Sequence, residues 1–151
     1  MDTVQFPGLA GLKAFVRPLD MSDLDSCVEV ESAFPEQERC SREKFIYRLT
    51  VCPDICLGLF VENSGQVELV GHVIATRVPG NRVTDGAMER KALMDEYSEY
   101  ARNGIEMAQS IVIIAYDHLI RFDESFGFKN LGPSPCTLSD EGWYDMLWAI
   151  L

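Results

Sequence analysis

The sequence lacks a hydrophobic run long enough to cross a membrane. Its apolar runs, such as Ile111 to Ala115, have the length of a strand, whereas a membrane helix needs about 20 residues. The first residues, Met1 to Gly8, contain no basic cluster followed by an apolar core, which is the pattern of a secretory signal peptide. We therefore expect a cytoplasmic protein without a membrane partner.

Positive charge is scarce. The chain has 13 Lys and Arg against 24 Asp and Glu, which gives a net charge of −11 and a pI near 4.5. A surface of this sign repels phosphate backbones, so nucleic acid is not expected as a partner. It favours a small cationic ligand such as a protonated amine, although acidic residues also serve simply to keep a domain soluble.

The cysteines follow no disulfide or metal-binding pattern. Cys52 and Cys56 are one residue too far apart for a C-x-x-C motif, and neither His72 nor His118 completes the ligand spacing of a zinc site. The five cysteines are odd in number and scattered, at Cys27, Cys40, Cys52, Cys56 and Cys136. We expect reduced thiols and no metal.

A length of 151 residues and 47% apolar content predict one domain over residues 1–151, with a loose arm over residues 1–11. The expected order is β-α-α-β-β-α-β-α-β-β. Strands are expected over residues 14–19, 56–62, 67–77, 111–115, 128–131 and 143–151, and a long helix over 87–102. Helices alternate with strands only in the second half, which predicts a mixed sheet with helices on both faces.

Two shorter helices are expected in the first half. Ser22 is the predicted N-cap of one, and the other begins at Ser41 and ends before Cys52-Pro53. The second helix is expected to turn Phe45, Ile46 and Leu49 inward. Between the two helices, residues 35–38 read as a loop, and the turn of the following hairpin is Asn63-Ser64-Gly65.

Two blocks of sequence are distinctive. Residues 52–62 read C-P-D-I-C-L-G-L-F-V-E, and residues 110–128 read as an apolar strand, a short helix and F-G-F. Shorter segments accompany them, V-E-V-E-S-A-F (28–34), N-R-V-T (81–84), Gly132-Pro133 and Asp145-Met146. Together they resemble the GNAT superfamily of acyl-CoA-dependent N-acetyltransferases, in particular its arylalkylamine N-acetyltransferase branch. The resemblance implies an α/β (α+β) fold with a mostly antiparallel sheet flanked by helices. It also implies acetyl-CoA as cosubstrate and a small primary arylalkylamine as acyl acceptor.

Part of the family pattern is missing from this chain. The family's fourth strand carries catalytic histidines and leads into a loop, Q/R-x-x-G-x-G/A, which holds the pyrophosphate at a helix N-terminus. Here Lys91 runs directly into Ala92, where the resemblance resumes. We therefore predict that one central strand is missing. The strands at residues 67–77 and 111–115 would then either pair directly or leave a cleft.

The resemblance assigns roles to particular positions. Ordinary core packing explains some of them equally well, Ile114 above all, while the ring of Trp143 could stack on an aromatic substrate. The implied substrate-binding residues are Phe34, Ile114, Leu138 and Trp143. The implied cofactor-binding residues, along the pantetheine arm, are Ile113, Ala115, Leu119 and Phe122.

Asp123 stands at the catalytic position where the family has a tyrosine that protonates the departing thiolate. An aspartate with the ordinary pKa of about 3.9 is ionised at pH 7 and cannot donate that proton. Only burial that raises this pKa by several units would make it an acid, and the alternative is a solvated helix residue. His72 and His118 are candidate replacement bases, although strand and helix-start roles explain them too. Two functions stay open: an N-acetyltransferase, impaired in this chain, and a non-catalytic GNAT-fold binding or regulatory module or inactive deleted isoform.

Overall fold

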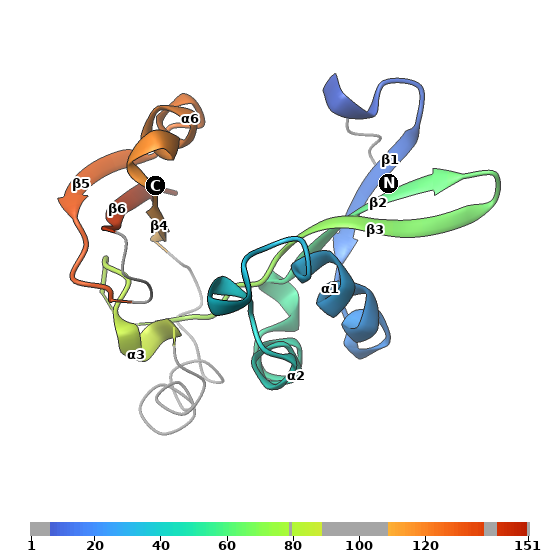
Figure 1. Ribbon diagram of the computed structural model, residues 1–151, viewed down its shortest axis with the longest axis horizontal. Helices are drawn as coiled ribbons and strands as arrows, with labels where there is room; N and C mark the ends of the chain where they lie inside the picture. Colours follow the sequence, from blue (N-terminus) through green and yellow to red (C-terminus); the bar gives the residue numbers. More distant parts are fainter. Residues whose placement is uncertain (1–6, 79, 89–108, 138–141, 151) are drawn as a thin grey trace. The chain divides into compact units, whose positions relative to one another are not determined.

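The computed structural model describes residues 7–78, 80–88, 109–137 and 142–150, which form two three-stranded antiparallel sheets (Figure 1). The chain divides into two compact units, Met1–Thr76 and Arg77–Leu151, and each is described by itself. The prediction of one domain stays a prediction. No helix within the described ranges is long and apolar enough to span a membrane.

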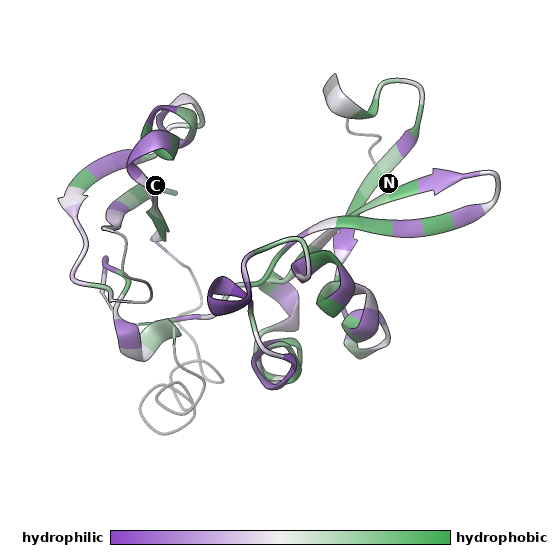
Figure 2. Ribbon diagram, viewed as in Figure 1, coloured by the Kyte–Doolittle hydropathy of each residue, from purple (hydrophilic) through white to green (hydrophobic). Residues whose placement is uncertain are grey.

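The first unit contains a meander with the strand order β1-β2-β3. Its strands are β1 (Lys13–Pro18), β2 (Leu57–Asn63) and β3 (Gln66–Val73). Ser64 and Gly65 connect β2 to β3 with positive φ angles of 52° and 83°, the conformation of a tight hairpin turn whose twist matches the strands. Hydrophobic and hydrophilic residues alternate along β3 (Figure 2), as expected of a strand with two different faces.

Two helices of this unit, α1 (Leu24–Glu31) and α2 (Arg42–Val51), pack against each other, and α1 also packs against β3. Short 3-10 turns precede or follow them at Pro7–Leu9, Met21–Asp23, Glu36–Glu38 and Pro53–Ile55. The buried core joins both helices to the sheet through Leu19, Leu24, Cys27, Phe45, Leu49, Cys56, Phe60 and Leu69. The helices are therefore held mainly by one shared apolar cluster.

Most of the local predictions for this unit are confirmed, and four need correction. Ser41 caps α2, since its side chain accepts a hydrogen bond from the Lys44 N–H. Ile46 is 39% exposed, and Tyr47 is buried instead, because the helix turns that side toward the core. β3 ends at Val73 and not at residue 77, because its partner β2 begins at Leu57, directly opposite Val73. The loop predicted at 35–38 contains the 3-10 turn Glu36–Glu38.

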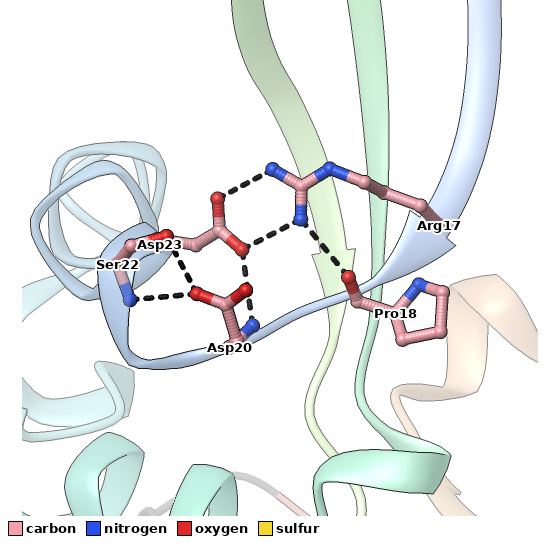
Figure 3. Close-up of polar contacts among 5 residues, drawn as sticks. All are labelled: Arg17, Pro18, Asp20, Ser22 and Asp23. Carbon is pink, nitrogen blue, oxygen red and sulfur yellow. Dashed lines mark hydrogen bonds and ion pairs between the residues drawn. The ribbon is translucent and has the colours of Figure 1, made fainter.

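The fourth correction concerns the predicted cap at Ser22, because Asp20 caps the 3-10 turn Met21–Asp23 that leads into α1. The Asp20 carboxylate accepts hydrogen bonds from the backbone N–H and the hydroxyl of Ser22, while Asp23 accepts from the Asp20 N–H (Figure 3). Arg17 donates to both oxygens of Asp23, at 2.7 Å each, and its guanidinium lies 3.9 Å from the centre of the Phe60 ring. This network ties the end of β1 to the start of the helical segment.

The second unit contains a sheet with the strand order β4-β6-β5. Its strands are β4 (Ser110–Ala115), β5 (Lys129–Pro133) and β6 (Tyr144–Ala149). A 3-10 turn at Asp117–Leu119 and the short helix α6 (Ile120–Ser125) connect β4 to β5. A further short helix, α3 (Asp85–Met88), includes the first two residues of the helix predicted over 87–102, and residues 89–102 lie outside the described residues.

The prediction that a central strand is missing stays a prediction. β3 belongs to the first unit and β4 to the second, and each lies in its own three-stranded sheet. Residues 74–78 and 80–88, which follow β3, contain no strand. The proposed junction at Lys91 and Ala92 lies outside the described residues.

The Arg17–Asp23 pair generates a prediction about pH. The hydrogen bonds from Arg17 hold the pKa of Asp23 below its ordinary value. The stabilisation is therefore complete above the unfolded pKa of about 3.9 and is lost as the pH falls through the lower folded pKa. We expect Asp23→Asn to lower the free energy of unfolding by about 2 kcal/mol at pH 7, since hydrogen bonds to a charged group are removed.

Urea unfolding at a series of pH values checks this prediction. The difference between wild type and Asp23→Asn should shrink as the pH falls below about 4. Asp25→Asn is the matched control, because the Asp25 side chain is 86% exposed in its pair with Arg42 and should contribute less than about 1 kcal/mol. A difference for Asp23→Asn that stays constant down to low pH would contradict the assignment.

Candidate functional site

Two of the candidate substrate residues, Ile114 and Trp143, lie at the pairing of β4 with β6 in the second sheet. Ile114 pairs with Asp145, and because side chains alternate along a strand the two share a face. Trp143 directly precedes β6, and its ring stacks on that of Tyr116, which directly follows β4. We call Ile114, Tyr116, Trp143 and Asp145 the candidate face.

Aromatic rings stack at one end of the candidate face. The rings of Tyr116 and Trp143 lie 4.1 Å apart at an angle of 29°, and the ring of His118 stacks on Tyr116 at 5.6 Å. Trp143 is 8% exposed, whereas His118 is exposed. A planar stack of this kind fixes the orientation of the buried indole.

A buried ion pair lies beside the aromatic rings. Asp145 is 1% exposed, and its Oδ2 accepts a hydrogen bond of 2.9 Å from Nη1 of Arg82. Arg82 is partly exposed and also donates to the Leu131 carbonyl. Arg82 thereby neutralises a carboxylate that would otherwise be costly to bury.

Two buried polar atoms of the candidate face have no hydrogen-bond partner among the described residues. One is a donor, Nε1 of Trp143, and the other is an acceptor, Oδ1 of Asp145. Buried polar side-chain atoms are nearly always hydrogen-bonded, so each unpaired one needs a physical explanation. The sequence matched Arg82 and Asp145 to separate family segments, but no sequence signal joined two residues 63 positions apart.

The candidate cofactor residues lie on the opposite side of β4 and on the connection that follows it. Ile113 pairs with Met146 and therefore faces away from Ile114. Ala115 shares that face and is buried. Leu119 and Phe122 are 40% and 61% exposed, and Phe122 packs edge-on against Phe126 at 5.0 Å. Their roles stay predictions.

β4 is an edge strand in the described part of its sheet, where it pairs with β6 alone. One side of Ser110–Ala115 therefore presents backbone N–H and C=O groups without a described strand beside it. An extended ligand with amide groups can hydrogen-bond to such an edge in the way that an added strand does.

Asp123 is half-buried on α6, and this burial raises the pKa of its carboxyl group. The direction is the one that a proton donor needs, because a higher pKa increases the protonated fraction near neutral pH. The alternative interpretation, a solvated helix residue, stays open. Its catalytic role stays a prediction.

Three other candidates lie outside the candidate face. Phe34 belongs to the first unit, where it is 51% exposed on a loop whose carbonyls at Ser32 and Phe34 accept hydrogen bonds from Arg39. His72 lies in the same unit, with Nε2 at 3.3 Å from a carboxylate oxygen of Glu31 but without the geometry of a hydrogen bond. Leu138 lies outside the described residues.

The fold is similar to two solved structures over nearly the whole chain. One is the loading GNATL domain of CurA from Lyngbya majuscula, with a TM-score of 0.65 and 14% sequence identity, over 91% of this chain and 98% of that one. The other is Ard1 from Thermoplasma volcanium, with a TM-score of 0.60 and 19% identity over the same shares. The predicted fold class, antiparallel strands flanked by helices in a GNAT-like arrangement, is confirmed.

Comparisons of sequence add no relative. No protein-family model and no curated protein matches the chain. At identities below 20%, the two solved structures define the fold and leave the arylalkylamine branch as a proposal.

The Arg82–Asp145 pair generates a prediction about stability. Arg82→Leu leaves the Asp145 carboxylate buried and unpaired, so we expect the free energy of unfolding to fall by about 3 kcal/mol. The double variant Arg82→Leu with Asp145→Leu removes both charges and should recover most of that loss. Urea unfolding of the variants checks this, and a double variant that is less stable than Arg82→Leu alone would contradict it.

Proposed function

We propose that the protein is an acyltransferase that transfers the acetyl group of acetyl-CoA to a small primary amine of the arylalkyl class. The observation that carries the proposal is the GNAT-like fold over 91% of the chain, in which an edge strand lies beside an aromatic and acidic face. Fold alone does not define activity, so the residues of this face supply the chemical argument.

The chemistry is the attack of an amine on a thioester. An ammonium substrate first loses one proton to water. The lone pair of the neutral nitrogen then forms a C–N bond to the acetyl carbon, the C–S bond breaks, and a further proton from nitrogen ends on the sulfur as a free thiol. The edge of β4 offers backbone hydrogen bonds to the amide groups of the pantetheine arm. Tyr116 and Trp143 offer ring surfaces to an aromatic amine, and the net charge of −11 attracts a cation.

The five scattered cysteines of the sequence follow no disulfide pattern, which supports the cytoplasm as the proposed location, because reducing compartments keep thiols reduced. Every one of these thiols is a potential background signal for a thiol reagent, which matters for the assay below.

One observation favours a second candidate, a non-catalytic binding module. Asp123 replaces the tyrosine acid of the resembled family, and the family's phosphate-loop motif is absent from the sequence. Such a module would bind acetyl-CoA through the same edge of β4 without transferring the acetyl group.

An acetylation assay distinguishes the two functions. Incubation with acetyl-CoA and tryptamine or phenethylamine should release thiol and form the acetylated amine, the latter measured by mass spectrometry to avoid the protein's own thiols. A rise in melting temperature with acetyl-CoA but no product would favour the binding module, since ligand at 100 times its Kd stabilises by about 2.7 kcal/mol. If the assay gives no product and acetyl-CoA causes no thermal shift, both functions are contradicted.

A further inference from the structure

The two unpaired polar atoms of the candidate face form a complementary set. Trp143 Nε1–H can only donate a hydrogen bond, and an ionised Asp145 Oδ1 can only accept one. Both side chains are more than nine-tenths buried. A group that binds to both atoms must therefore accept a hydrogen bond from the indole and donate one to the carboxylate.

The reacting centre of an amide-forming acyl transfer brings that combination. Its acyl oxygen gains negative charge in the tetrahedral intermediate, and its nitrogen carries an N–H. We propose that Trp143 Nε1–H donates a hydrogen bond to the acyl oxygen, and that Asp145 Oδ1 accepts one from the N–H of the attacking amine. This inference rests on the acyltransferase function proposed above and names the residues that would stabilise its intermediate.

The surrounding contacts hold both groups in place. Trp143 directly precedes β6, and Asp145 is the second residue of that strand. The Tyr116 ring stacks on the indole and fixes its plane, and Arg82 holds the other oxygen of Asp145. Preorganised donors of this kind stabilise a developing oxyanion because they need no rearrangement during the reaction.

Asp145 orients the amine in this proposal and does not remove its proton. Arg82 already donates a hydrogen bond to Oδ2 of this carboxylate, so Oδ1 is the oxygen that faces the amine in the proposal. The nitrogen lone pair forms the C–N bond, the C–S bond breaks, and the proton from nitrogen ends on the departing sulfur. No further reactant is required.

The chain offers a matched pair of variants, because it has two tryptophans. Trp143→Phe keeps a ring against Tyr116 but removes the N–H. Trp148→Phe makes the same change at a 41% exposed position on the opposite face of β6. We expect Trp143→Phe to lower kcat about 100-fold with KM within twofold of wild type, and Trp148→Phe to change neither.

A binding measurement gives a readout that does not depend on turnover. N-acetyltryptamine contains the amide N–H and C=O of the product, and calorimetry should show about tenfold weaker binding to Trp143→Phe than to wild type or Trp148→Phe. Circular dichroism and the melting temperature establish that each variant is folded.

The outcomes separate the inference from the proposed function. If the wild type turns over and Trp143→Phe keeps a kcat within threefold of it, the inference is overturned and the proposed function stands. No wild-type turnover, together with amide binding that depends on Trp143, would overturn the function and support this site as an amide-binding site. A crystal structure in which a single water joins Nε1 to Oδ1 while the amide binds elsewhere would overturn the inference.

Discussion

The antiparallel pairing of β4 with β6 is the constraint on which the candidate site depends. Side chains alternate along a strand, so the register that sets Ile114 opposite Asp145 also sets Tyr116 beside Trp143. A slip of one residue would move every one of these side chains of β6 to the other face.

The two units use an arginine–aspartate pair in different ways. Arg17 donates to both oxygens of Asp23, and the Asp20 N–H donates a further hydrogen bond. Both oxygens of this carboxylate therefore have partners within the fold. Arg82 contacts a single oxygen of Asp145 and leaves the other without a partner among the described residues. A buried carboxylate oxygen without a hydrogen bond lowers the stability of the fold. We therefore attribute a binding role to the second pair, Arg82 and Asp145.

Local signals in the sequence were enough for much of the fold and for part of the site. The turn at Ser64-Gly65, the cap at Ser41 and the strand Ser110–Ala115 each follow from neighbouring residues. Asp20 was missed as a cap because Asp20 and Ser22 are both good capping residues and only the position of Arg17 and Asp23 decides between them. The Arg82–Asp145 pair and the stacking of Tyr116 on Trp143 were missed because tertiary pairing creates them.

The central claim is that the indole N–H of Trp143 meets the acyl group, and NMR of the tryptophan side chains tests it most directly. A ¹⁵N-labelled sample should give two indole N–H signals, assigned with the Trp148→Phe variant. On addition of N-acetyltryptamine we predict that the Trp143 signal shifts in the direction of a new hydrogen bond while the Trp148 signal stays in place. A bound ligand that leaves the Trp143 signal unmoved would contradict the account.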